Sequence, residues 1–192
     1  LSTTGVYGDC KGNWVEEKDP PKPQQPRSKR RLACEEAWLA SNLPVQILRL
    51  PGIYGKGRSA IDSILKGNTK LVDKPNQVFS RIHVDDIAGA IFYLIQLAEQ
   101  GIKPNIINVA DDLPSSNIEV LKFAASLIGH TLPPIESFES ASNSMSPMAL
   151  SFWQENRKVS NNLLCNKLGY KLLHPNYKSG LKDCLERQRE LT

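Results

Sequence analysis

Apolar and polar residues alternate along the first 130 residues in blocks that predict strands and helices in turn. Residues 45–50 (VQILRL) and 105–111 (NIINVAD) are β-branched and nearly all apolar, as in strands covered on both faces. Residues 77–84 (QVFSRIHV) alternate as a strand does. Helical spacing predicts four helices, at about 28–41, 59–67, 85–101 and 118–129. Strands that alternate with helices predict an α/β fold with a mostly parallel sheet.

Two further segments set the organisation of the chain. Residues 18–26 (KDPPKPQQP) hold four prolines, which remove backbone donors and fix φ, so we expect a surface loop there. After residue 130 the pattern becomes short-looped and helical, with a last helix from about 178. We therefore expect one domain over 1–130 and a small lobe over 131–192, with a ligand cleft between them.

Composition and charge exclude several classes of protein. The 192 residues carry a net charge of +4, and acidic residues lie close to the basic cluster at 27–31, so no nucleic-acid partner is expected. No run of 18 apolar residues and no signal peptide occur, so no membrane partner is expected. Four cysteines without a CxxC pair and three widely spaced histidines predict no metal site. Scattered free thiols favour the cytoplasm or an organelle stroma.

Three segments carry candidate chemistry, each with a plainer alternative. Residues 52–60 (GIYGKGRSA) follow a strand, but their G-x-x-G-x-G spacing matches no phosphate-binding loop, so a tight turn lining the cleft is favoured. Residues 1–9 (LSTTGVYGD) hold hydroxyl groups that can bind a substrate, or that simply form a turn. In residues 80–91 (SRIHVDDIAGAI), His83 is expected in the core and the two aspartates at the start of the helix.

Five motifs in one order carry a family resemblance: STTGVYG, LRLPGIYGKGR, RIHVDDIA, INVADD and NRKVSN with LGYKL. Together they resemble the second half of an extended short-chain dehydrogenase/reductase of the nucleotide-sugar epimerase/dehydratase type, closest to its atypical YeeZ-like branch. The resemblance implies a Rossmann fold that binds NAD or NADP, with a small C-terminal lobe for substrate. The chain also begins with Leu, inside the end of a predicted strand. We therefore expect the preceding Rossmann half of the same protein to be its partner.

The resemblance also implies roles for individual residues. Thr3 takes the catalytic Ser/Thr position, and Tyr7 lies in the same loop. The residues expected to hold the cofactor are Thr3, Arg31, Pro51, Gly52, Ile53 and Tyr54. The residues expected to hold an anionic substrate are Arg27, Arg58, Arg81 and Arg157. We also expect Arg157 or Lys158 to contact a ligand anion or the loop that contains Thr3.

The chain departs from this family at the start of the helix near residue 28. Active members carry Tyr-x-x-x-Lys there, because the lysine lowers the pKa of the tyrosine that transfers the proton. One register places Arg27 and Arg31 at these positions, and a shift by two places Gln25 and Lys29 there. Neither supplies a tyrosine, and arginine cannot exchange a proton near neutral pH. The cluster then either binds an anion or is a solvated helix start.

The sequence thus predicts an NAD(P)-binding protein of the nucleotide-sugar epimerase/dehydratase type without the usual Tyr-Lys pair. Its ligand is expected to be a small molecule such as a nucleotide sugar, and a homodimer is compatible with the sequence. If Tyr-dependent chemistry is replaced, Tyr7, Tyr54 or a bound water is the candidate proton carrier. The alternative function is a non-catalytic dinucleotide-binding regulator or sensor.

Overall fold

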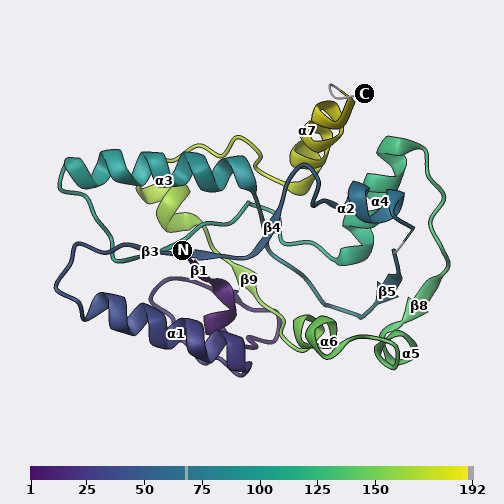
Figure 1. Cartoon of the computed structure of the whole chain (residues 1–192), viewed down its shortest axis with the longest axis horizontal. Coiled ribbons are helices and arrows are strands. Elements are labelled where there is room, and N and C mark those ends of the chain that lie inside the picture. The colour runs from purple at the N-terminus through teal and green to yellow at the C-terminus, as the bar shows by residue number, and fades with distance from the viewer. Residues whose placement is uncertain (68, 190–192) are drawn as a thin grey trace.

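A computed structural model describes residues 1–67 and 69–189, and its centre is a three-stranded parallel sheet in the order β1-β3-β7 (Figure 1). These strands are β1 (Ser2–Thr3), β3 (Ile47–Leu50) and β7 (Ile106–Asn108). All four residues of β3 are buried, which confirms the prediction of a strand covered on both faces. The α/β fold with parallel strands is therefore confirmed.

Two long helices cover the two faces of this sheet (Figure 1). Helix α3 (Val84–Glu99) buries Ile87, Ala90 and Leu94 against an apolar cluster that includes residues of β3 and β7. Helix α1 (Pro26–Leu39) lies on the other side and buries only Ser28 and Glu35. The second face of the sheet is thus covered largely through polar side chains.

A second group of elements packs beside the sheet around its own apolar cluster (Figure 1). Its helices are α2 (Ala60–Leu65), α4 (Asn117–Ile128) and α7 (Tyr177–Arg189). Helix α4 begins at Ser116, whose hydroxyl and the Glu119 carboxylate form a capping box, and it ends at Gly129 in the left-handed conformation. Both ends agree with the sequence prediction.

Short parallel strand pairs connect segments that are distant in sequence. Strand β4 (Gly52–Tyr54) pairs with β6 (Arg81–His83), and β5 (Leu71–Asp73) pairs with β8 (Ile135–Ser137). Strand β2 (Trp14–Val15) pairs with β9 (Lys158–Val159). The last two pairs join residues before 130 to residues after it, so strand pairing runs across the expected boundary between domain and lobe.

Several expected boundaries were wrong for local reasons. Helix α1 begins at Pro26 rather than 28, because proline at the first helical position loses no hydrogen bond. Only the end of the expected strand 77–84 forms β6, while Phe79 makes an isolated bridge to Ser115. The segment after 130 is less helical than expected: α5 (Phe138–Ser142), α6 (Pro147–Trp153) and a π-helical turn (Leu163–Lys167) alternate with β8 and β9. Among the described residues, no helix is both long and apolar enough to cross a membrane.

Candidate functional site

A cavity of about 480 Å³ opens at the carboxyl ends of the parallel strands β1 and β3. Thr3 ends β1, and Pro51 directly follows β3. The cavity is also lined by Phe152 and Trp153 of α6 and by Arg157, which directly precedes β9. Ligands of parallel α/β sheets bind outside the carboxyl ends of the strands, so this cavity lies where the fold places a ligand.

The cavity brings together most of the residues that the sequence assigned to cofactor and substrate. Those that line it are Thr3, Pro51, Gly52, Ile53, Tyr54, Arg58, Arg81 and Arg157. They come from four separate stretches of the chain. The fold thus brings residues that are distant in sequence to one cavity.

A second cavity of about 480 Å³ shares part of this lining. Tyr54, Arg58, Arg81 and Asn117 line both spaces. The second space extends between α2, α4 and α7, and Lys66 and Lys70 add positive charge there. An elongated ligand with negative groups along its length would match this arrangement of arginines and lysines.

Thr3 is prepared to donate a hydrogen bond at the end of β1. Its Oγ1 accepts a bond from Gly5 N at 3.1 Å, which caps the short 3-10 helix Thr4–Tyr7. A threonine hydroxyl that accepts one bond still has a proton to donate. Thr3 can therefore bind a carbonyl or hydroxyl oxygen of a ligand in the cavity.

The arginines of the cavity are fixed to different degrees. Arg81 Nη1 donates to Phe79 O at 2.9 Å and to Ser115 O at 3.0 Å, which orients its guanidinium. Arg157 Nη1 donates to Gly8 O and to Glu155 Oε2, both at 2.7 Å. The bond to Gly8 confirms the expected contact between Arg157 and the loop that contains Thr3. Arg58 is exposed at the turn after β4 and is the freest of the three.

Three of the expected site residues do not line the cavity. The Tyr7 side chain is buried, and its hydroxyl donates to Asn108 Oδ1 at 2.8 Å. The Arg31 side chain is exposed and makes no hydrogen bond, ion pair or ring contact with another described residue. Arg27 lies nearby, with its guanidinium carbon 4.2 Å from the ring centre of Phe152, which does line the cavity. Arg27 thus joins the start of α1 to the wall formed by α6.

Neither tyrosine near the site is suited to act as a base. Burial raises the pKa of Tyr7, although the neighbouring Arg49 opposes this effect. Burial also raises the pKa of Tyr54, and Asp111 adds to the shift. Both phenols therefore stay protonated at neutral pH. In the described part of the chain the cations that lower their pKa values are the guanidinium groups of Arg49 and Arg81, not a lysine ammonium.

Beneath the cavity lies a polar layer that the sequence did not reveal. The register places Ser2, Arg49 and Asn108 side by side across the sheet, and Glu35 of α1 contacts Ser2 and Arg49. Arg49 donates to Glu35 from Nη2 at 2.7 Å and from Nε at 3.2 Å, and Ser2 donates to the same carboxylate. Strand residue Arg49 looked like one polar position in an apolar run. Its partner is Glu35, the first acid of the pair EE, which the sequence alone did not assign to it.

The strand-to-helix segment around His83 has a structural role, as expected. His83 is fully buried and caps α3 by accepting from Asp85 N at 3.3 Å. Asp86 does not cap the helix; its carboxylate accepts from Leu173 N at 2.6 Å and from His174 N at 2.9 Å. It therefore fixes the segment that leads into α7.

Comparisons with known proteins agree with this geometry. The model of the NAD dependent epimerase/dehydratase family matches residues 1–110. A structure of a functionally unknown conserved protein from Silicibacter pomeroyi is similar with 40% identity and a TM-score of 0.88, over 97% of this chain and 65% of that one. A protein from Methylobacillus flagellatus, assigned as an NAD-dependent epimerase/dehydratase, is similar with 31% identity and a TM-score of 0.75, over 98% of this chain and 63% of that one.

A third structure shares the fold alone. The dTDP-glucose 4,6-dehydratase from Bacillus anthracis, in complex with NAD, has 20% identity and a TM-score of 0.73, over 98% of this chain and 60% of that one. The chain thus spans less than two thirds of the length of each of these proteins. No curated protein matches it.

Proposed function

Because the chain belongs to the NAD-dependent epimerase/dehydratase family, we propose that it binds NAD or NADP together with a nucleotide sugar but lacks ordinary Tyr-dependent turnover. The observation that supports this most directly is the cavity at the carboxyl ends of β1 and β3. Eight residues that were assigned to cofactor and substrate line this single space.

The lining fits the two kinds of ligand at different places. Pro51, Gly52 and Ile53 present backbone and small apolar groups beside Thr3, as a flat nicotinamide ring requires. When bound, the dinucleotide would supply the hydride acceptor. Arg58, Arg81 and Arg157 present guanidinium groups that pair with phosphate in a bidentate manner. A diphosphate lying along both cavities would meet Arg58 and Arg81 in turn.

No residue of this cavity is arranged as the proton carrier that the family uses. Tyr54 is held protonated by burial, and Glu155, the carboxylate among the described lining residues, is paired with Arg157 at 2.7 Å and is therefore not a free base for Thr3. Thr3 can polarise a ligand oxygen, but it cannot remove a proton at neutral pH without such a base. This supports the alternative function, a dinucleotide-binding regulator or sensor, and it makes turnover the deciding measurement.

The test uses the full-length protein with NAD, NADP and a panel of nucleotide sugars. We expect binding of a dinucleotide by calorimetry and no reduction of bound nicotinamide in single-turnover absorbance measurements. The double variant Arg27→Tyr with Arg31→Lys restores the family's pair in one register, and we expect it to gain hydride transfer. Arg30→Ala, in the same exposed helix start, serves as the control that leaves binding unchanged.

Two results would overturn the proposal. A folded protein that binds neither dinucleotide would contradict the cofactor, and rapid hydride transfer by the unaltered protein would contradict the loss of Tyr-dependent chemistry. Loss of dinucleotide affinity in Arg31→Ala alone would assign an anion-binding role to the basic helix start. An unchanged affinity would make Arg31 a solvated residue, as its exposure in the structure favours.

Three broader features belong to the same proposal. We place the protein in the cytoplasm or an organelle stroma, with free thiols. Residues 1–130 form part of the dinucleotide-binding domain, and 131–192 form the substrate-side lobe. The preceding Rossmann half of the same protein completes the cofactor site, and a homodimer is the assembly that we would test first.

A further inference from the structure

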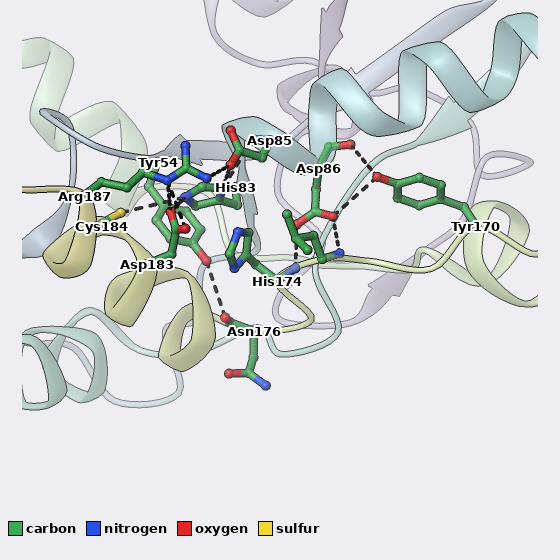
Figure 2. A network of polar contacts seen from close by, with 11 residues as sticks. Tyr54, His83, Asp85, Asp86, Tyr170, His174, Asn176, Asp183, Cys184 and Arg187 are labelled. Carbon is green, nitrogen blue, oxygen red and sulfur yellow. Dashed lines mark hydrogen bonds and ion pairs between the residues drawn. The ribbon is translucent and has the colours of Figure 1, made fainter. Parts of the chain in front are cut away.

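Two histidines that are far apart in sequence lie together beside α7. The rings of His83 and His174 have their centres 4.1 Å apart, and Asp85 and Asp183 lie next to them (Figure 2). One ligand atom from each of these four residues lies within 4.8 Å of the other three. We expected no metal site because the histidines are far apart in the sequence. The fold nevertheless brings His83 and His174 together in space.

We propose that this histidine–aspartate cluster (His83, Asp85, His174 and Asp183) binds one divalent transition-metal ion of the zinc type. The ligands are His83, His174 and Asp183, while Asp85 orients the His83 ring. Two imidazole nitrogens and one carboxylate oxygen form a set that suits Zn²⁺, with water at the fourth position. Nothing in the proposed dinucleotide function requires this site.

A buried atom without a partner points to a missing ligand. His174 is 7% exposed, and its Nε2 has no hydrogen-bond partner among the described residues. A buried polar atom in that state costs free energy unless something binds it. In Figure 2 the His174 ring lies between the His83 ring and the chain leading to Asn176, close to the Asp183 side of the cluster.

The two nitrogens of His83 face different carboxylates. Nδ1 lies 3.9 Å from Asp85 Oδ2, and Nε2 lies 3.6 Å from Asp183 Oδ2 and 3.8 Å from Cys184 Sγ. Metal binding at Nε2 requires the proton on Nδ1, so the Asp85 N–H gives up its 3.3 Å bond to Nδ1. The Asp85 carboxylate, at 3.9 Å too far for a hydrogen bond, then has to move closer to accept that proton. A carboxylate in this position fixes the ring orientation at carboxylate–histidine–zinc sites.

Geometry requires only a small closure of the side chains. Ligand atoms about 2.1 Å from a tetrahedral zinc ion stand roughly 3.4 Å from one another. The present spread of up to 4.8 Å therefore shrinks by up to about 1.4 Å on binding. His83 ends β6, Asp85 opens α3, His174 precedes α7 and Asp183 lies within α7, so the metal would tie the last helix to the sheet.

Arg187 is the competing cation. Its guanidinium contacts Asp85 and also Asp183, with Nε 2.9 Å from Asp183 Oδ2 (Figure 2). The Arg187 side chain is 40% exposed, so these ion pairs are weak and the arginine can turn to solvent. It neutralises the carboxylates, but no contact joins it to the two imidazoles in the described part of the chain.

The test is titration of the metal-free, untagged full-length protein with Zn²⁺ by calorimetry, and with Co²⁺ by absorbance. We expect one site per chain, intense Co²⁺ bands of tetrahedral geometry, and a Tm that rises with Zn²⁺. Outer residues of zinc sites change affinity by about 10–100-fold, so loss of a ligand in His174→Gln should weaken binding by at least roughly 100-fold. His130→Gln, an exposed histidine outside the cluster, should bind like the unaltered protein.

A second variant keeps the proposal testable if His174→Gln does not fold. Arg187→Gln removes the competing cation, and we expect it to bind Zn²⁺ about tenfold more tightly than the unaltered protein. Absence of Zn²⁺ binding would overturn the site, as would affinity unaffected by both His174→Gln and Arg187→Gln. Binding that disappears in His130→Gln would assign the metal to the surface instead.

Discussion

Replacing Glu35 by glutamine tests the polar layer that holds α1 beneath the cavity. Glu35 and Arg49 are each 2% exposed, and two nitrogens of Arg49 donate to the Glu35 carboxylate. Glutamine keeps the size of the side chain but removes its charge, so the Arg49 guanidinium stays buried without a counter-charge. We therefore expect a large loss of stability, although the substitution only replaces one carboxylate oxygen by an NH2 group.

The size of the loss follows from the burial of the pair. Removing one partner of a buried ion pair costs about 3–5 kcal/mol, whereas an exposed pair is worth about 0–1 kcal/mol. In a domain of 150–250 residues, 1 kcal/mol shifts Tm by about 2–4 °C, so we expect Tm to fall by roughly 6–20 °C. Ser2, which donates to the same carboxylate, retains an acceptor in the amide oxygen.

Urea unfolding of the full-length protein, followed by circular dichroism, measures this loss. The control is Glu36→Gln, because Glu36 follows Glu35 in α1 and is exposed. It should change stability by less than about 0.5 kcal/mol. Replacing both partners by methionine should recover most of the loss, since apolar pairs of similar volume often match a buried ion pair. A Glu35→Gln protein as stable as the Glu36→Gln control would refute the buried pair.

Three further changes address pH, packing and the ligand. Burial raises the pKa of Asp111 to about 7, so the folded chain retains a proton that the unfolded chain releases above about pH 4. The free energy of unfolding should therefore fall between about pH 4 and 7, by up to about 1.4 kcal/mol per pH unit. Unfolding curves of Asp111→Asn at several pH values should show a flatter slope, and an unchanged slope would contradict the raised pKa of Asp111. Gly180→Ala places a Cβ 2.2 Å from the Tyr54 hydroxyl, so it should cost about 1–3 kcal/mol and shift Tyr54 in the cavity, and a fully stable variant would contradict that contact. Arg81→Gln should weaken binding of a nucleoside diphosphate by about tenfold or more in calorimetry, and Arg30→Gln is the control that should leave it unchanged. Equal affinities of Arg81→Gln and the unaltered protein would exclude Arg81 from the ligand site.

The sequence predicted those parts of the fold that local patterns determine. Apolar runs marked β3 and β7, and helical spacing at about 118–129 marked α4 to within one residue at each end. Two- and three-residue strands such as β2, β5, β8 and β9 carry too few side chains to show a period, and their pairing depends on the tertiary fold. The strand at 77–84 was expected too long because the alternation begins at Gln77, before the first paired residue of β6, Arg81.

The candidate site was predicted where motifs are local and missed where contacts are distant. Thr3 and the segment 51–54 each stand beside a strand end, so their position followed from the strand. Tyr7 lies in the same loop as Thr3, as expected, but its hydroxyl donates to Asn108, about a hundred residues away in the sequence, and does not face the cavity. The meeting of His83 with His174 likewise depends on how α7 returns to β6. No spacing in the sequence encodes that return.

We propose that the cavity at the ends of β1 and β3 holds a nicotinamide dinucleotide and its substrate without a catalytic tyrosine. A crystal structure of the full-length protein soaked with NAD or NADP and a nucleotide sugar tests this most directly. We predict the nicotinamide ring against Thr3 and the segment 51–54, with substrate phosphate at Arg58 and Arg81, and no tyrosine hydroxyl in contact with the reacting sugar atom. A dinucleotide bound elsewhere, or a tyrosine hydroxyl in contact with that atom, would contradict the account.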